Sequence, residues 1–420
     1  MTNAVGLGNV MRTLVAAGAL TCVTAASPAQ EQSKPLLAAA EHLVVPFLEI
    51  TKKMVDIESP SLDENGILAM EEELARQIRQ LGGDVHTAAA GVGPGRNVMG
   101  RWRGSGKARI LLVSHMDTVY PAGTSKTFFW RQDGNRIYGP GVLDDKGAIA
   151  IGLMAVRVLR ELGRDTYGTV TLLSTTDEEK RSAGSQALIE RLARDHDVAF
   201  VLEFGAPDDR IVSSRKGIGY FRVEVAGKAA HAGAEPEKGC NAAVEMAYQI
   251  LQMKDLSRPE KETSLNFTLL SGGERSNIIP AEAKAQADIR VLDPAEFDRI
   301  ENDAAVLAAT KRLLTCSKVR TSLERGRPPF PFSDGTSKLV ARAQSIYREI
   351  GRELKTEASG AGTDGNYTAA AGTATLDGLA PVGGGAHAAG EEYIELDKIA
   401  PRIYLLVRLM EEVSRDTLPK

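Results

Sequence analysis

Hydrophobic residues along the first half of this chain follow two alternating periods. Three segments repeat apolar residues at helical spacing, at 66–83, 147–163 and 185–195. Short apolar runs of strand type lie between them, at 108–115, 168–175 and 198–203. Strands that alternate with helices are typical of an α/β layer. The pattern therefore predicts a largely parallel central sheet.

The pattern changes near residue 217. The segments 218–227 and 282–291 alternate strictly between apolar and polar residues, and helical spacing follows each of them, at 242–253 and 295–314. Alternating strands with one polar face indicate an antiparallel sheet covered on one side. We therefore expect a small α+β unit of antiparallel strands and two helices.

Long helical patterns return after Arg327-Pro328-Pro329, around a glycine-rich centre. They lie at 335–351 and 397–415. The simplest organisation is one α/β domain, residues 30–215 and 326–420, interrupted by a smaller α+β domain at 216–325. A chain of 420 residues exceeds the usual size of one hydrophobic core, which also favours two domains.

The first 29 residues are of another kind. No charged residue lies between Arg12 and Glu31, and an apolar run of small residues ends at Ser27-Pro28-Ala29. This pattern predicts a cleaved signal peptide and a periplasmic or secreted protein. A frayed helical terminus, or a lipid anchor at Cys22, is the alternative. No later stretch is long and apolar enough to predict a membrane span.

Charge and cysteine content narrow the class of protein further. The net charge of −4 becomes −5 without Arg12 (50 basic against 55 acidic residues), which gives no reason to expect nucleic acid as a partner. Only Cys240 and Cys316 would remain after export. Two cysteines are too few for a disulfide framework. Buried free thiols are the expectation, and a single bridge is the alternative.

Residues that can bind metals stand where the apolar strands end, or in glycine-rich turns. They are His115 and Asp117, Asp144 and Asp145, Glu178 and Glu179, Glu203, and His387. Open α/β sheets hold their sites at such strand ends. Taken singly, each residue also fits an ordinary surface role, and an aspartate of the Asp144-Asp145 pair could simply cap the following helix.

Taken together, these residues predict a metal site. Mixed nitrogen and oxygen ligands suit zinc, with cobalt or manganese as substitutes. Even five of these candidates as ligands would exceed the four that one tetrahedral zinc binds. Two metals that share one carboxylate are therefore the simplest arrangement. An aspartate two residues after a histidine can hold the second ring nitrogen, and Glu178 beside Glu179 is placed to deprotonate a water.

The ordered motifs identify a family resemblance. The chain resembles the glutamate carboxypeptidase (carboxypeptidase G) group of dizinc exopeptidases, which is related to acetylornithine deacetylases, succinyl-diaminopimelate desuccinylases, aminoacylases and tripeptidases. The motifs follow the family's order and cover nearly the whole chain after the leader. They are LLVSHMDTVY, YGPGVLDDKG, TTDEEK, GKAAHAG, SNIIPA, ADIR, RGRPPF, GAGTDGNY and GGGAHAAGEEY.

The resemblance implies a role for each residue of the site. His115 and Glu203 would bind one zinc, Glu179 and His387 the other, and Asp144 would bridge them. Glu178 would be the general base, Asp117 would orient His115, and Asp145 would be a structural partner of its turn. The interrupting domain would form a homodimer, and its His231 would reach the partner's active site to stabilise the oxyanion.

The same resemblance implies substrate contacts and an activity. Asn277, Arg290, Gly362 and Thr363 would bind the substrate, with Arg290 on its terminal carboxylate. The expected enzyme is a zinc carboxypeptidase that removes a C-terminal, acidic residue, for which Arg210, Arg325 and Arg327 are candidate partners. The alternatives are an N-acyl-amino-acid deacylase or a di/tripeptidase, and, more remotely, a non-catalytic dimerisation protein.

Overall fold

A six-stranded mixed sheet forms the centre of the computed structural model, which describes residues 28–416. Its strands, in spatial order, are β1 (Asp84–Ala89), β2 (Arg96–Arg103), β6 (Thr169–Thr175), β3 (Arg109–His115), β7 (Val198–Val201) and β14 (Ala374–Leu376). The four strands from β6 to β14 are parallel. β1 and β2 add an antiparallel edge. The predicted parallel-rich sheet is confirmed, apart from this edge.

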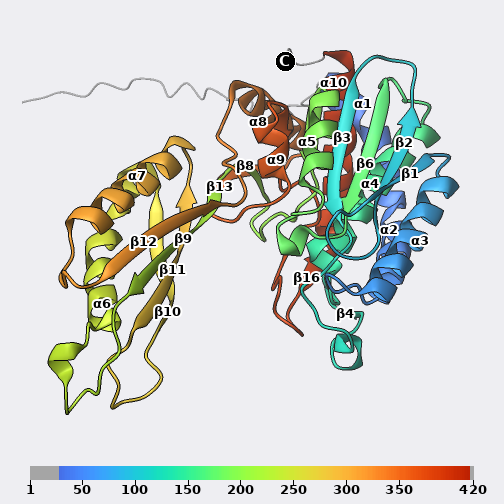
Figure 1. The fold of residues 1–420 in the computed structure, drawn as a ribbon. Helices are drawn as coiled ribbons and strands as arrows, with labels where there is room; N and C mark the ends of the chain where they lie inside the picture. Colours follow the sequence, from blue (N-terminus) through green and yellow to red (C-terminus); the bar gives the residue numbers. More distant parts are fainter. Residues whose placement is uncertain (1–27, 417–420) are drawn as a thin grey trace, which may run out of the picture.

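Helices cover both faces of the central sheet (Figure 1). They are α1 (Pro28–His42), α2 (Val44–Val55), α3 (Glu64–Gln80), α4 (Gly147–Glu161), α5 (Gln186–Asp195), α8 (Asp334–Glu349), α9 (Gly365–Ala370) and α10 (Leu396–Arg415). Successive side chains of β3 point to opposite faces: Ile110 and Leu112 join the core with α4 and α10, while Leu111 and Val113 join the core with α5. A strand buried on both sides explains the continuous apolar run in the sequence.

The antiparallel sheet is a separate layer with a core of its own. It runs in the order β10 (Ser264–Gly272), β11 (Glu282–Val291), β9 (Gly217–Ala226) and β12 (Lys318–Arg325), and the helices α6 (Ala242–Met253) and α7 (Ala295–Thr310) pack on it. In β9, Phe221, Val223 and Val225 are buried, whereas the residues between them are exposed. Figure 1 shows this unit to one side of the larger layers. The predicted sheet with two helices is confirmed.

Short elements complete the frame around the larger sheet. β8 (Arg210–Arg215) pairs in parallel with β13 (Lys355–Ser359), and a small antiparallel sheet joins β15 (Gly383–Gly384), β16 (Tyr393–Glu395), β5 (Arg136–Tyr138) and β4 (Arg131–Asp133). Single helical turns lie at η1 (Thr124–Lys126), η2 (Val142–Lys146), η3 (Glu178–Lys180), η4 (Pro236–Lys238), η5 (Lys254–Leu256) and η6 (Pro259–Lys261). The loop between β15 and β16 carries His387, and η2 and η3 carry acidic residues of the site.

The chain crosses to the antiparallel sheet and back through two segments that lie side by side. Arg215 and Phe330 each donate a backbone N–H to the other's carbonyl, at 2.8 and 2.9 Å. Farther along, the Ile218 N–H donates to the Arg327 carbonyl at 2.8 Å, and the Gly326 N–H donates to the Ile218 carbonyl at 2.8 Å. The two crossing segments therefore form a narrow backbone ribbon, which we call the crossing ribbon.

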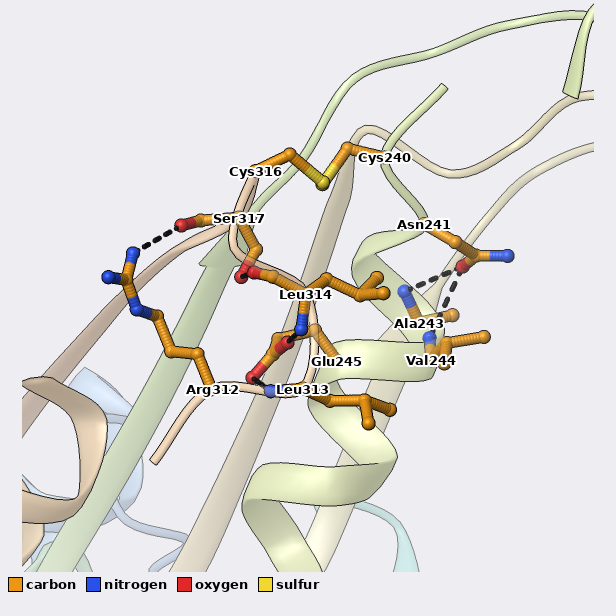
Figure 2. Close-up of a disulfide and its surroundings, with 10 residues drawn as sticks. All are labelled: Cys240, Asn241, Ala243, Val244, Glu245, Arg312, Leu313, Leu314, Cys316 and Ser317. Atoms are coloured by element: carbon orange, nitrogen blue, oxygen red, sulfur yellow. Dashed lines mark hydrogen bonds between the residues drawn. A yellow bond between two sulfur atoms is a disulfide. The ribbon is translucent and has the colours of Figure 1, made fainter. Parts of the chain in front are cut away.

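The cysteines are not free thiols, and that expectation is wrong. Cys240 and Cys316 form a disulfide, with their Cα atoms 6.1 Å apart. The first precedes α6 and the second precedes β12, and the bridge joins these two loops (Figure 2). Beside the bridge, the Glu245 carboxylate of α6 accepts the N–H groups of Leu313 and Leu314 at 3.3 and 2.6 Å. Sequence spacing could not reveal this meeting of two distant loops.

The predicted signal peptide lies outside the described residues, except for Pro28 and Ala29 at the start of α1. Within residues 28–416, no helix combines the length and the apolar character that crossing a bilayer requires.

Candidate metal centre

The five predicted ligands lie at one edge of the central sheet. His115 is the last residue of β3, Glu179 lies in η3 after β6, and Glu203 lies two residues beyond β7. Because β6, β3 and β7 are parallel neighbours, their carboxyl ends meet at the same edge. Asp144 of η2 and His387 of the β15–β16 loop complete the group. His387 has φ 66°, a left-handed conformation that is uncommon outside glycine and is concentrated at functional sites.

Asp144 lies between the two histidines. Its Oδ1 is 2.9 Å from His115 Nε2, and its Oδ2 is 2.9 Å from His387 Nε2. Glu179 Oε2 is 3.6 Å from His387 Nε2. Potential ligand atoms lie within 4.8 Å of one another in three sets: His115, Glu178 and Glu203; His115, Asp144 and Asp145; and Asp144, Glu179 and His387. The geometry therefore contains two adjacent places for a cation, with Asp144 between the histidines.

Asp117 braces both the first histidine and the acidic turn. Its backbone carbonyl is 3.0 Å from His115 Nδ1, and its carboxylate Oδ1 is 3.3 Å from the same atom. The carboxylate also accepts the backbone N–H groups of Glu178 and Glu179, at 3.1 and 3.2 Å, and the Ser61 hydroxyl at 2.7 Å. Asp117 thus fixes the ring of His115 and the position of η3 together.

Two further carboxylates hold the ligands in place. Asp145 Oδ2 accepts the backbone N–H of His115 at 3.0 Å, so it braces the end of β3 as well as belonging to the η2 turn. Glu392, which is fully buried, accepts the backbone N–H groups of Gly141, Leu143 and Asp144 at 3.1, 2.8 and 3.0 Å. Sequence reasoning missed Glu392, although it lies in the GEEY segment of a motif already singled out.

The buried carboxylates of the site lie close together, and this changes their pKa values. Burial and the neighbouring charge of Asp144 raise the pKa of Glu179 to about 8. Burial, followed by the charges of Asp144 and Glu178, raises the pKa of Glu203 well above its usual range. Burial alone would raise the pKa of Asp144, but hydrogen bonds from His115 and His387 lower it. Acids this close repel one another unless a positive charge lies among them.

These residues fit a pair of divalent cations. Glu179 Oε1 and Asp145 Oδ1 are buried and have no hydrogen-bond partner among the described residues, which is costly unless an ion or water satisfies them. The available ligand atoms are imidazole nitrogen and carboxylate oxygen, a set that suits zinc, cobalt or manganese.

A cavity of about 310 Å³ opens onto the ligands. Its wall includes Gly362 and Thr363, as well as the five carboxylates Asp144, Glu178, Glu179, Glu203 and Glu357. Arg327 also lines it and contacts Glu178 directly, with Nη2 2.6 Å from Oε1. The predicted base and two predicted substrate contacts therefore face the same space as the ligands.

Three predicted site residues of the antiparallel unit, His231, Asn277 and Arg290, do not line this cavity. His231 and Asn277 are exposed, and the N–H of Ala232, next to His231, donates to the Asn277 carbonyl at 2.9 Å. Arg290 bridges the units, because its Nη1 donates to the Gly360 carbonyl at 3.1 Å.

The candidate arginines for an acidic substrate are largely occupied. Arg210 pairs with Asp208 and with Glu357. Arg325 pairs with Asp298 and Glu301 of α7, at 2.5 and 3.1 Å, away from the cavity wall. Arg327 alone of the three lines the cavity. A fourth arginine, Arg215, also lines it, and no sequence pattern singled it out.

Comparison with known proteins agrees with this geometry. Residues 111–412 match the model of Peptidase family M20/M25/M40. That span includes all five ligands and well over half of the chain. The chain belongs to this family. The predicted membership of the wider exopeptidase and deacylase family is confirmed, and this M20 protein is a metal-dependent hydrolase.

Individual relatives extend the match over the whole chain. Carboxypeptidase G2 of Pseudomonas sp. (strain RS-16) is 36% identical over 412 residues, covering 97% of this chain and 99% of that protein. Succinyl-diaminopimelate desuccinylase of Gluconacetobacter diazotrophicus is 30% identical over 270 residues, covering 59% and 68%. The crystal structure of aminopeptidase PepT from Bacillus cereus superimposes with a TM-score of 0.76 at 26% identity, covering 87% and 98%.

Proposed function

We propose that this M20 protein is a zinc-dependent carboxypeptidase that hydrolyses the amide bond to a C-terminal acidic amino acid. One observation carries the proposal: the three sets of ligand atoms are linked through His115 and Asp144, and Glu178 lies on the same cavity wall. The nearly full-length similarity to carboxypeptidase G2 supports the choice of reaction within the family.

The ligand sets indicate which residues would hold each metal. His115 and Glu203 would hold one zinc, Glu179 and His387 the other, and Asp144 would contact both. Bound there, two zinc ions would polarise the scissile carbonyl and supply an activated water. Cobalt or manganese suits the same donors.

Glu178 would act as the general base. It takes the proton of the attacking water and passes it to the leaving amine, which needs a carboxylate that faces the cavity. The contact with Arg327 Nη2 at 2.6 Å holds the Glu178 side chain in place. Arg327 is held in turn, because its Nη1 donates to the Gly362 carbonyl at 2.6 Å.

Substrate binding would use both units of the molecule. Arg290, which contacts Gly360 and pairs with Asp288, would exchange the Asp288 pair for the terminal carboxylate, and Gly362 and Thr363 of the cavity wall would also contact the substrate. His231 and Asn277, exposed on the unit at 216–325, would serve the active site of a second subunit, with His231 stabilising the oxyanion. This arrangement requires a homodimer.

The antiparallel unit offers a surface suited to such a dimer. β10 is an edge strand whose consecutive residues Leu269 and Leu270 are 61% and 67% exposed. The neighbouring helix α6 exposes Val244 and Leu251. An apolar edge that can pair with its own copy about a twofold axis supports dimerisation through this unit. Export to an oxidising compartment, proposed from the leader, is supported by the Cys240–Cys316 bridge.

Replacement of the base tests the mechanism. We expect Glu178→Ala to lower kcat by about 10³-fold while leaving the zinc content unchanged, because Glu178 moves a proton rather than holding a metal. Lys180→Ala, an exposed change in the same turn η3, is the matched control. Near-normal turnover by zinc-loaded Glu178→Ala enzyme would show that the base is assigned wrongly.

An N-acyl-amino-acid deacylase is the second candidate, favoured by the similarity to succinyl-diaminopimelate desuccinylase. The same catalytic residues attack an amide in both cases, so a substrate screen must decide. We expect zinc-loaded protein to release glutamate from folate-like and N-acyl-glutamate compounds faster than acetate from N-acetyl derivatives of neutral amino acids. The reverse order would favour the deacylase.

A further inference from the structure

Three arginines line the cavity beside the ligands, and they differ in what they are free to do. Arg327 is largely occupied, because its Nη1 donates to the Gly362 carbonyl and its Nη2 contacts Glu178; its Nε is buried and has no hydrogen-bond partner among the described residues. Arg181 is exposed and lies over the Tyr220 ring, with Cζ 4.6 Å from the ring centroid. The remaining one is Arg215, the last residue of β8.

Arg215 is held rigidly from one side. Its side chain is only 6% exposed, and its Nε donates to Asp377 Oδ2 at 2.6 Å. Its Nη1 donates to the Ala361 carbonyl at 3.3 Å. Its backbone is fixed as well, through the paired bonds to Phe330 in the crossing ribbon. A guanidinium held in this way has lost its rotamer freedom before any substrate arrives.

The other side of the guanidinium has no partner in the protein. A guanidinium carries five N–H groups, two of them on Nη2. Within residues 28–416, no atom accepts a hydrogen bond from Arg215 Nη2, although the side chain lies on the cavity wall. A nearly buried N–H group needs an acceptor. A ligand in the cavity is placed to supply it.

Asp377 anchors Arg215 without closing off the cavity. It also accepts the Thr363 hydroxyl at 2.7 Å and the Gly378 N–H at 2.5 Å, so its oxygens are occupied on the protein side. Of the five carboxylates on the wall, four are ligands or base in the proposed mechanism, and the fifth, Glu357, pairs with Arg210. The cavity therefore needs a cation for any acidic group of the substrate, and Arg215 offers a planar donor of the kind that binds carboxylates.

We propose that Arg215 is the specificity-determining residue for an acidic C-terminal side chain, with Nη2 donating to the substrate's side-chain carboxylate. This assignment rests on the proposed carboxypeptidase function, in which Arg290 takes the terminal α-carboxylate. Arg290 reaches Gly360 from the antiparallel unit, whereas Arg215 reaches Ala361 from β8. The two carboxylates of a C-terminal glutamate would then have separate partners on the two sides of the segment 360–361.

The test compares two substrates that differ only in charge. N-acyl-glutamate and N-acyl-glutamine have the same shape, so the ratio of their kcat/KM values measures recognition of the carboxylate. The first variant, Arg215→Lys, keeps the positive charge near Asp377 but lacks the second group of N–H donors, those on Nη2. The second is the double change Arg215→Met with Asp377→Asn, which removes both buried charges together. Arg222→Met, an exposed arginine on β9, is the control for loss of a positive charge.

We expect wild-type enzyme to prefer glutamate and Arg215→Lys to lower the ratio by about tenfold, chiefly through KM. The double variant should lower it by about 10²-fold, because kcat/KM should fall far more for the glutamate compound than for the glutamine compound. Arg222→Met should leave the ratio unchanged. As a second readout, the zinc-loaded Glu178→Ala protein should bind glutamate more tightly than glutamine in calorimetric titration, and adding Arg215→Lys should remove the difference.

The outcomes separate this inference from the proposed function. An unchanged glutamate-to-glutamine ratio in folded, zinc-loaded Arg215 variants would overturn the inference alone. A wild-type enzyme that releases glutamate and glutamine equally well would overturn both the inference and the acidic preference of the proposed function, but not its carboxypeptidase reaction. A wild-type enzyme that releases no C-terminal residue from either compound would overturn the carboxypeptidase function, and the role of Arg215 with it.

Discussion

At the scale of single residues, Glu392 connects two ligands that are far apart in sequence. It follows His387 by five residues, and its carboxylate holds the backbone of the turn that presents Asp144. One oxygen accepts the Gly141 N–H, and the other accepts the N–H groups of Leu143 and Asp144. Glu392 is therefore a positioning residue for the candidate metal centre, since it holds the turn of Asp144 and belongs to none of the three sets of potential ligands.

Removal of this carboxylate should weaken metal binding. We expect Glu392→Ala to lower zinc affinity by about 10–100-fold, because three backbone N–H groups lose their acceptor and Asp144 loses its support. Glu392→Gln should be intermediate, since its amide oxygen can still accept two N–H groups but its NH₂ would oppose the Gly141 N–H. The measurement is zinc retained against a competing chelator. The exposed neighbour variant Glu391→Gln is the control, and equal affinity in all variants would contradict the role.

His196, remote from the metals, should make stability depend on pH. It is buried, with Nδ1 2.6 Å from the Leu192 carbonyl and Nε2 2.9 Å from the Thr171 hydroxyl, and burial lowers its pKa below the usual 6.5. Between the lowered pKa and pH 6.5, the His196 side chain binds a proton in the unfolded chain but not in the folded protein. The stability from neutral His196 is therefore complete above pH 6.5 and decreases as the pH falls.

Urea unfolding at several pH values checks this expectation. Between pH 6.5 and the lowered pKa, His196 should contribute a slope of up to about 1.4 kcal/mol per pH unit to the free energy of unfolding. His196→Gln should remove that part of the slope, whereas the exposed His86→Gln should retain it. Parallel stability curves for wild type and His196→Gln would disprove the assignment.

The residues found from sequence and those missed differ in how they act. His115, Asp144, Glu179, Glu203 and His387 stand at strand ends or in glycine-rich turns, so their type and their place in the sequence are enough to indicate a site. Arg215 and Glu392 act through a tertiary ion pair and through backbone N–H groups of a distant turn. Neither kind of contact produces a characteristic residue spacing, so neither can be recognised from the sequence.

At the scale of elements, the apolar pattern located β3, β6, β7, β9 and β11. It overlooked the edge strands, and also β2 and β8, which are largely buried. β9 and β11 alternate because one face of each packs on α6 and α7. β1 and β10 are edge strands that expose most of their residues, and the strands β4, β5 and β16 have three residues each. A strand that buries little carries no apolar alternation to recognise.

The disulfide should stabilise the antiparallel unit. The bridge joins residues 76 positions apart, and closing a loop of that size restricts the unfolded chain by about 2–4 kcal/mol. We expect the double variant Cys240→Ser with Cys316→Ser to lose about that much free energy of unfolding in urea titrations. Wild type with reductant should behave like the variant, and the variant should not respond to reductant. Identical midpoints with and without the bridge would contradict this.

At the scale of the whole molecule, the proposed active site requires two chains. We expect light scattering after size exclusion to give the mass of a dimer for wild type, and of a monomer for Leu269→Lys with Leu270→Lys, because charges on β10 oppose edge pairing. Val306→Lys, an exposed position on α7, is the control and should remain dimeric. Loss of the dimer should lower activity, because His231 would no longer reach the active site of the second subunit. The zinc content should stay constant. A fully active wild-type monomer would refute the arrangement.

The crossing ribbon has a consequence for how this chain can be cut and joined. Ile218 and Gly326 lie on neighbouring backbones at the foot of the antiparallel sheet, joined by the bond from the Gly326 N–H to the Ile218 carbonyl. A gene in which a short turn replaces the intervening codons would therefore keep Arg215 and Arg327 in register on either side of the junction. Insertions are tolerated where the two ends of a segment meet in this way. Another protein domain could also be inserted between Ile218 and Gly326. A conformational change in that domain would then act on the backbone next to Arg215 and Arg327 of the cavity wall.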